Sequence, residues 1–299
     1  MARLLALDWD QYEARYVVAS TRGTQLILEA AASVAIPESP DGGSSRLQLG
    51  AVLQGALASH KVARAVTLVG VERSQIELLG LTLPPSSDAE LPELVRHQAM
   101  RESSAIHDDS ALDFVPLSEE ANEPRKVAAV ALSRERLEQI QAVCADAGVT
   151  PNAIVLRPYA AAVLFLGSLP PTDQPCLLIN VFAEEIDLSV VSAGKVAFWR
   201  TLRQAKVSHD PVAAKKLIAE LNRTLVVAQD QLGNQPIEAA YLFGVLAEHP
   251  ALVEQLRSDF SLAVTLLDPF ATLAEPPHEI PENPGRFGSL LGMSKTART

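Results

Sequence analysis

The chain has 299 residues, of which 48% are hydrophobic and 20% are charged, a balance typical of a globular protein with one large core or two domains. Its net charge of −11 disfavours direct binding to nucleic acid, because phosphate contacts require a surplus of Lys and Arg on some face. Two cysteines are too few for a disulfide framework or a zinc site, and the six histidines lack metal-ligand spacing, so no metal is predicted.

The first 83 residues are predicted to form mainly strands. Apolar or alternating runs predict strands over 3–8, 13–20, 24–35, 64–71 and 75–83. The composition of 37–45 is that of a loop, and the apolar spacing of 47–60 predicts a helix.

Pro84-Pro85 ends this pattern and a different block follows over 84–150. Ser87 and Glu90 have the spacing of a capping box for a helix, although Pro92 favours a start a few residues later. Strands are predicted over 111–117 and 126–132, and a helix over 133–147. This α-β-β-α block is interpreted as a small inserted α+β subdomain.

The remainder repeats the opening pattern. A strand, a hairpin, a second strand, a turn, a third strand and a helix occur over about 3–60 and again over 175–232. This duplication predicts the two-lobed α/β architecture of the actin and sugar-kinase ATPases, which is ribonuclease-H-like. The predicted parts are a first lobe over 1–83, the insert over 84–150, a return to the first lobe over 151–174, a second lobe over 175–275, and a segment over 276–299 that returns to the first lobe or forms a tail.

The turn after the first strand has the frame of a phosphate-binding hairpin. Such a turn needs a small residue, usually Gly, so that backbone N–H groups can approach the phosphates. Here it reads Asp8-Trp9-Asp10-Gln11-Tyr12-Glu13, with three carboxylates and no glycine. Asp8 and Asp10 could also be solvated carboxylates that only stabilise a turn.

Four segments carry a family resemblance, in collinear order. They are LTLPPSSDAELPELVRHQAMRE with LDFVPL (81–117), KVAAVALSRERLEQIQAVCADAGVTPNAIVLRPYAAAVLF (126–165), CLLINVFAEEIDLSVVSAGKVAFWRTL (176–202) and EAAYLFGVLAEHPALVEQLRSDFSLAVTLLDPF (238–270). Together they resemble the pilus-assembly protein PilM and its GspL-type relatives, a family with an actin-like fold.

The resemblance implies a degenerate nucleotide cleft. Asp8 stands at the family's metal-side Asp, but Asp10 replaces the glycine two residues later. In the second hairpin Asn180 replaces an Asp and Phe182 replaces a Gly. Where the family has two adjacent glycines on the adenosine side, this chain has Gly244 followed by Val245. The cleft predicted in this way consists of Asp8, Asp10, Asn180, Phe182, Gly244 and Val245. We expect no catalytic residue, no ATP hydrolysis and no tightly bound cofactor.

The resemblance also implies a function and a location. A member of this type is expected to be a cytoplasmic component of a type IV pilus or type II secretion-like assembly, placed at the inner membrane by a single-pass partner of PilN type. Because the nucleotide cleft of this chain is degenerate, we expect it to be a non-catalytic scaffold there. The partner's cytoplasmic peptide docks in a groove between the first lobe and the insert, which points to 64–85 and 84–150 here. The amino terminus resembles no signal peptide, and no run of about 18 apolar residues exists, so membrane contact is expected only through the partner.

Two alternatives remain. An active ATPase or small-molecule kinase would bind Mg-ATP between the lobes, with Asp8 near the metal-bound phosphate and Glu184 or Glu185 as the base. A cell-division scaffold related to FtsA would need a membrane-binding helix at its end. Only four apolar residues of the last segment could serve there, namely Phe287, Leu290, Leu291 and Met293. The stretch GRFGSLLGM, however, resembles the family segment that returns to the first lobe.

Overall fold

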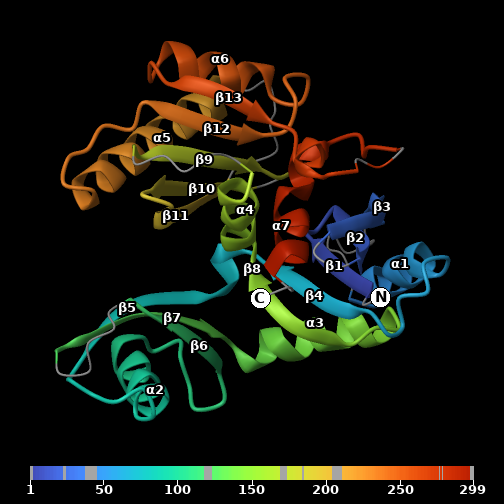
Figure 1. Ribbon diagram of the computed structural model, residues 1–299, viewed down its shortest axis with the longest axis horizontal. Coiled ribbons are helices and arrows are strands. Elements are labelled where there is room, and N and C mark those ends of the chain that lie inside the picture. Colours follow the sequence, from blue (N-terminus) through green and yellow to red (C-terminus); the bar gives the residue numbers. More distant parts are fainter. Residues whose placement is uncertain are drawn as a thin grey trace. The chain divides into compact units, whose positions relative to one another are not determined.

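The structure is a computed structural model that describes residues 3–22, 25–37, 46–117, 123–168, 174–183, 185–203, 211–275, 277 and 279–296. Two compact units divide the chain: Met1–Val71 with Ala145–Thr299, and Glu72–Cys144. The larger unit contains two sheets of five strands and the smaller unit one sheet of three. Figure 1 labels their strands.

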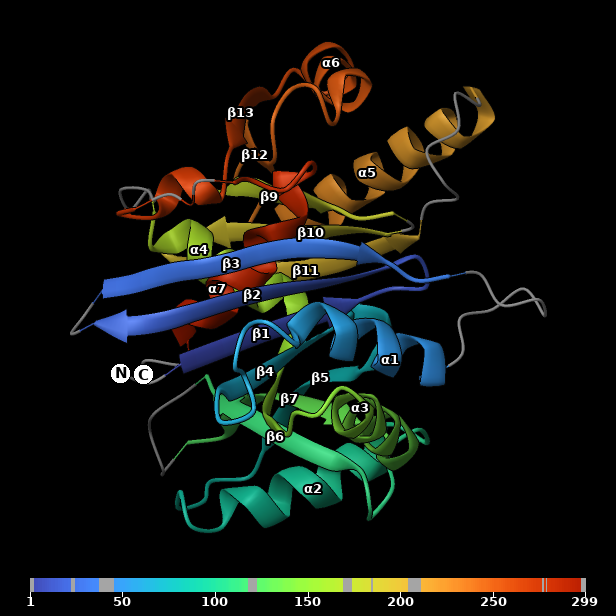
Figure 2. The same ribbon diagram turned by 90° about the vertical axis from the view of Figure 1, so that its right-hand side faces the viewer.

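The first sheet of the larger unit has the strand order β3-β2-β1-β4-β8. Its strands are β1 (Arg3–Trp9), β2 (Glu13–Arg22), β3 (Gln25–Ala35), β4 (Val66–Val71) and β8 (Pro151–Leu156). The two hairpins pair antiparallel, while β4 pairs parallel with β1 and β8. Because β1 is central and covered on both faces, it is apolar almost throughout. Figure 2 shows β1, β2 and β3 running beside one another, with the helix α1 (Arg46–Leu57) nearby.

The second sheet repeats this order with β11-β10-β9-β12-β13. The strands are β9 (Cys176–Val181), β10 (Glu185–Ser192), β11 (Lys195–Arg203), β12 (Ala239–Phe243) and β13 (Ala263–Leu267). The helices α5 (Pro211–Gln231) and α6 (Pro250–Ser258) supply apolar side chains to the core of this lobe. Since both sheets join two antiparallel pairs to two parallel ones, the predicted two-lobed duplication is confirmed.

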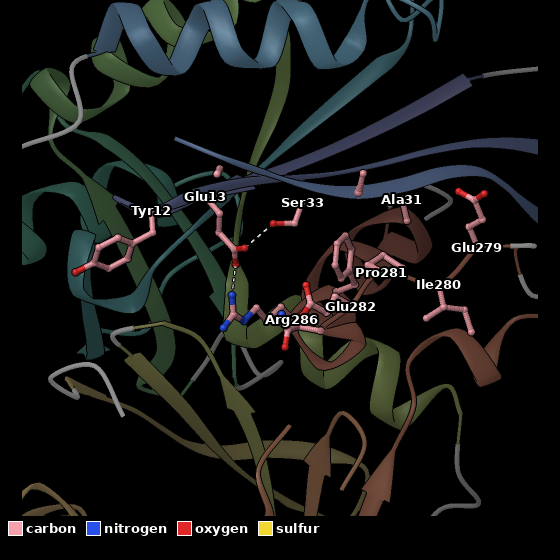
Figure 3. A pocket seen from close by; sticks show the side chains of 13 residues that line it. Tyr12, Glu13, Ala31, Ser33, Glu279, Ile280, Pro281, Glu282 and Arg286 are labelled. Carbon is pink, nitrogen blue, oxygen red and sulfur yellow. Dashed lines mark hydrogen bonds and ion pairs between the residues drawn. The ribbon is translucent and has the colours of Figure 1, made fainter. Parts of the chain in front are cut away.

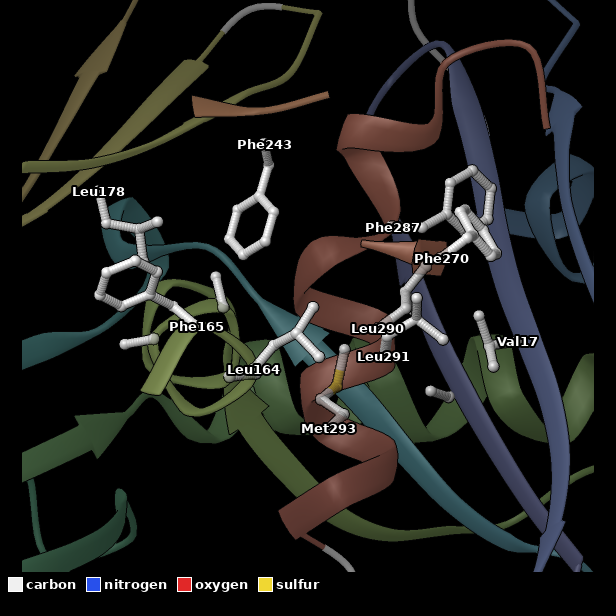
Figure 4. Close-up of a cluster of buried hydrophobic side chains, with 14 of the residues drawn as sticks. Val17, Leu164, Phe165, Leu178, Phe243, Phe270, Phe287, Leu290, Leu291 and Met293 are labelled. Atoms are coloured by element: carbon white, nitrogen blue, oxygen red, sulfur yellow. The ribbon is translucent and has the colours of Figure 1, made fainter. Parts of the chain in front are cut away.

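Two helices cross within the larger unit and carry its main core, α4 (Arg157–Leu166) and α7 (Gly288–Thr296). Figure 4 shows Leu164 of α4 beside Leu291 and Met293 of α7, and Phe165 of α4 beside Leu178 of β9. The α7 helix also contacts β1, β2 and β4 of the first sheet.

The last segment therefore supplies core side chains. Phe287, Leu290, Leu291 and Met293 are all buried in this core. A membrane-binding helix needs its apolar side chains on the surface. The structure thus argues against a membrane-binding role for these four residues, which the FtsA-like alternative requires. No helix in the described ranges is long and apolar enough to cross a membrane.

The smaller unit begins at Glu72, earlier than the predicted boundary at residue 84. The reason is that β5 (Glu77–Leu83), which the sequence analysis assigned to the first lobe, pairs with β7 (Arg125–Leu132). β7 also pairs with β6 (Ala111–Pro116), which completes the sheet β5-β7-β6. The unit ends at Cys144, within α3 (Arg134–Asp146). Asp146 already belongs to the larger unit, where it lies against Gly50 of α1.

One face of the three-stranded sheet is covered by α2 (Leu91–Glu102). Pro92 lies in the first turn of this helix, where a proline leaves no hydrogen bond unmade. Glu90 precedes the helix and accepts bonds from the backbone N–H and the hydroxyl of Ser87. The two residues therefore interact as their spacing suggested, but the helix starts at Leu91.

The short helical turns are η1 (Arg73–Gln75), η2 (Phe270–Thr272) and η3 (Pro284–Phe287).

Candidate functional site

The turn between β1 and β2 is closed by one of its own carboxylates. Asp10 Oδ1 accepts hydrogen bonds from the backbone N–H groups of Tyr12 (2.8 Å) and Glu13 (3.0 Å). These are the donors that a phosphate-binding turn would offer to its ligand. With Asp10 bound to them, these N–H groups are occupied by a carboxylate of the same turn.

A buried arginine lies beneath this turn. The guanidinium of Arg15 on β2 is 2.9 Å from Asp10 Oδ2, 2.6 Å from Glu13 Oε1 and 3.3 Å from Asp8 Oδ1. Burial alone would lower the pKa of Arg15, but these three carboxylates together raise it above its ordinary value. Asp8 is 1% exposed and paired, so its interpretation as a solvated turn carboxylate is wrong. Its two oxygens accept no hydrogen bond from the described residues, so the nearby guanidinium groups interact with it through charge alone.

The turn after β9 is closed as well. The backbone N–H of Phe182 donates to the carbonyl of Glu185 (2.8 Å), and the phenyl ring is buried. The guanidinium carbon of Arg157 lies 3.7 Å from the ring centroid, and that of Arg15 lies 5.1 Å from it. A cation over an aromatic face is stabilised by the ring quadrupole, most strongly where water is excluded. Phe182 thus packs between two lobes instead of leaving space for phosphate.

Arg157, the first residue of α4, connects the two hairpins. Its Nη2 is 2.9 Å from Glu185 Oε2 and its Nε is 2.9 Å from Asp187 Oδ2, both on β10. Its Nη1 lies 3.9 Å from Asp8 Oδ1 on β1. Of the two bases proposed for an active enzyme, Glu185 is therefore engaged in a buried ion pair, and Glu184 lies outside the described residues.

Asn180 on β9, predicted to belong to the nucleotide cleft, is also buried. Neither its amide oxygen nor its amide nitrogen has a hydrogen-bond partner among the described residues. Buried groups of this kind are usually satisfied by ordered water. A neutral amide supplies less electrostatic attraction to Mg²⁺ than a second carboxylate would.

In the third predicted nucleotide motif, after β12, the side chain of Glu248 fills the space beside Gly244. Gly244 has φ +124°, and a Cβ there would lie 2.8 Å from Glu248 Oε1. That oxygen accepts hydrogen bonds from the backbone N–H of Val245 (2.9 Å) and of Gly285 (3.4 Å). Burial raises the pKa of Glu248 above its usual value. The space beside Gly244 is thus occupied by a carboxylate of the same chain. Val245 is partly exposed.

The structure brings Asp8, Asp10 and Phe182 to one buried ionic cluster around Arg15 and Arg157, while Gly244 and Val245 lie against Glu248. Sequence reasoning missed Arg15, Arg157 and Glu248. One signal was present: Arg15 interrupts an otherwise apolar strand, and a buried arginine requires a carboxylate partner. In the described part of the chain no three His, Cys, Asp or Glu side chains are grouped so as to hold a metal.

We expect His249, beside Glu248, to make the fold sensitive to acid. Burial, and secondarily Arg286, lowers the pKa of His249 from 6.5 to about 4. Between these values the unfolded chain binds a proton that the folded chain does not, so stability falls as pH drops through this window. The loss is at most ~3 kcal/mol, and Glu248 offsets part of it because its raised pKa lets the folded state bind a proton.

Urea unfolding at a series of pH values tests this expectation. His249→Gln should flatten the dependence of unfolding free energy on pH between about 6.5 and 4, since the titrating ring is gone. His97→Gln, a change at a ring that is 65% exposed, should leave the dependence unaltered. Equal slopes for the wild type and His249→Gln would contradict the assignment.

Neither a protein-family model nor a curated protein sequence matches the chain. Solved structures do. A chain of a structure described as the PilM-PilN type IV pilus biogenesis complex is similar at a TM-score of 0.83 and 19% identity, over 99% of this chain and 98% of that one. The cytoplasmic domain of EpsL, an inner membrane component of the type II secretion system of Vibrio cholerae, gives 0.54 and 12%, over 100% and 96%.

A Bacteroides thetaiotaomicron protein described as having an actin-like ATPase fold and unknown function gives 0.53 and 11%, over 89% of this chain and 91% of that one. These likenesses agree with the repeated sheets and with the likeness to PilM drawn from the sequence. The chain therefore has the two-lobed actin-like ATPase fold, with an inserted three-stranded unit.

Proposed function

We propose that the chain is a non-catalytic scaffold of a type IV pilus or type II secretion-like assembly, and that its actin-like cleft is closed by its own side chains. One observation carries the absence of catalysis: Arg157 joins Asp8 of the first hairpin to Glu185 and Asp187 of the second. Mg-nucleotide in an active relative would have to bridge the same two hairpins. To bind here it would have to separate buried ion pairs, which costs several kcal/mol.

The proposed partner is a PilN-like inner-membrane protein, bound through its cytoplasmic segment. The full-length likeness to a chain of the PilM-PilN complex supports this choice, and the likeness to the EpsL cytoplasmic domain supports a secretion-like assembly as the other setting. The chain would then act at the cytoplasmic face of the inner membrane, placed there by the partner.

The smaller unit offers a surface for such a segment. Leu81 and Val127 point toward α2, so the alternating residues of the sheet lie on the opposite face. Across that face, Gly80, Ala128 and Val115 form one row of paired residues. Val115 is 63% exposed, and no described atom lies within 4 Å of the place where a Cβ of Gly80 would be. An extended apolar segment can approach the backbone closely at this row.

Calorimetric titration with the cytoplasmic segment of a PilN-like protein from the same genome tests the proposal. We expect binding that Mg-ATP neither promotes nor prevents, and no heat from Mg-ATP alone. Gly80→Glu should weaken the partner's binding about tenfold, by placing a charge on the apolar row. Gly55→Glu, on an exposed glycine of α1 with equally open surroundings, is the matched control.

The outcomes separate the hypotheses. Micromolar binding of Mg-ATP would overturn the closed cleft and restore the ATPase or kinase alternative; at a ligand concentration a hundred times Kd it would stabilise the fold by ~2.7 kcal/mol. Failure of every PilN-like protein from the genome to bind would overturn the scaffold proposal.

A further inference from the structure

Part of the outer edge of the first sheet lacks the residues that usually protect such an edge. β3 pairs with β2 and with no other described strand. Its second half, residues 30–35, reads AAASVA and contains no charge and no proline. Exposed edges of natural sheets are usually blunted by charged side chains, proline or bulges, because their free backbone groups can pair with another chain. This half of β3 lacks those protective residues.

A hollow of about 470 Å³ lies beside this edge. Figure 3 shows it between β3, with Ala31 and Ser33, and the segment that carries Glu279, Ile280 and Pro281. The β3 side is lined by small side chains, so a neighbouring strand could lie close to the backbone. Ile280 is 49% exposed and supplies an apolar contact on the opposite side.

The lining is acidic. It carries three carboxylates, Glu13, Glu279 and Glu282, against one guanidinium, that of Arg286, which pairs with Glu13 at 2.7 Å. Glu279 and Glu282 are exposed and form no ion pair with any described residue. Their uncompensated charge favours a cationic ligand, in keeping with the net charge of −11.

We infer that β3 and this hollow bind an extended basic segment of a partner protein, which adds a strand along the edge and directs a Lys or Arg side chain toward Glu279 and Glu282. Backbone pairing supplies affinity in this mode, and the side-chain pocket supplies selectivity. A second copy of the chain fits less well, since it would bring the same carboxylates together. This surface uses residues separate from the row at Gly80, so the inference goes beyond the proposed function.

The test uses a fluorescent peptide of alternating Val and Lys residues, titrated against the full chain and followed by anisotropy. A peptide with Glu in place of Lys is the charge control, and one with N-methylated alternate backbone positions cannot pair along one edge. We expect the Val-Lys peptide to bind, each control peptide to bind at least tenfold more weakly, and added salt to weaken binding.

Variants locate the site. Glu279→Gln/Glu282→Gln should weaken peptide binding about tenfold, whereas Glu238→Gln/Glu254→Gln, the same change at two exposed carboxylates of the other lobe, should not. Gly80→Glu should also leave it unchanged, which separates this surface from the proposed partner site. Equal binding by the first double variant, equal binding of the N-methylated peptide, or self-association of the chain that the peptide displaces would each overturn the inference.

Discussion

Replacing Arg157 with methionine is expected to lower the free energy of unfolding by ~3–5 kcal/mol, the range for breaking a buried ion pair. Methionine retains the length of the stem but removes the cation. Glu185 and Asp187 would then remain as buried carboxylates without their shared partner, and Phe182 would lose the guanidinium over its ring. Urea denaturation followed by circular dichroism measures the loss.

The same substitution at Arg200 is the control. Arg200 pairs with Glu220 at 2.7 Å, but the two side chains are 33% and 25% exposed, so Arg200→Met should change stability by about 1 kcal/mol or less. A triple variant sharpens the test, because Glu185→Gln and Asp187→Asn added to Arg157→Met remove the orphaned charges and should restore part of the loss. If the two arginine variants are equally stable, Arg157 does not hold the cleft.

The closed cleft has a consequence for the proposed scaffold. In the proposed function the two hairpins are bridged by groups of the chain itself rather than by a nucleotide. Here that bridge consists of Arg157 and its carboxylates, with Arg286 and Glu13 as a second link. Because these groups are part of the chain, the lobes stay connected without a ligand, which suits a protein that presents fixed binding surfaces.

The fold could be predicted because its signals are local. Alternating strands, tight turns and their repetition specify two similar sheets, and the strands predicted over the first 83 residues and over 111–132 lie within a few residues of the observed ones, whereas β12 and β13 were not predicted. The start of the insert could not be predicted in this way. β5 is a short apolar strand that either sheet could have accepted, and its pairing with β7 depends on residues some fifty positions away.

The site was predicted only in part, for a similar reason. Asp10 and Phe182 led to the prediction of a degenerate phosphate site, because a carboxylate and a phenyl ring stand where small residues were expected. What fills the space depends on partners distant in the chain, since Arg157 meets Asp187 only when α4 is packed against β10. A helix-opening Arg-Pro pair gives no sign of such a contact.

The second large effect is expected at Gly292 of α7. A Cβ there would lie 1.8 Å from the carbonyl oxygen of Ala160 on α4, and 2.6 Å from the carbonyl carbon. These are backbone atoms, so no side-chain rotation can relieve the overlap. The two helices pack tightly, because α4 has the small residues Ala161 and Ala162 near the crossing. They would have to move apart to accommodate the new Cβ. Gly292→Ala should therefore reduce the unfolding free energy by about 3 kcal/mol or more.

The matched control for Gly292→Ala is Gly55→Ala, which is expected to change stability in the opposite direction. Gly55 lies on α1 with no described atom within 4 Å of its missing Cβ, so Gly55→Ala should raise stability by ~0.5–1 kcal/mol through helix propensity alone. A measured gain, or no change, for Gly292→Ala would show that α4 and α7 can separate at little cost. Because α7 also packs on β1, β2 and β4, such freedom would loosen the first lobe against α4 and make Arg157 the principal connection across the cleft. Unfolding of Gly292→Ala combined with Arg157→Met separates these contributions: independent contacts predict additive losses, and a shared interface predicts a smaller sum.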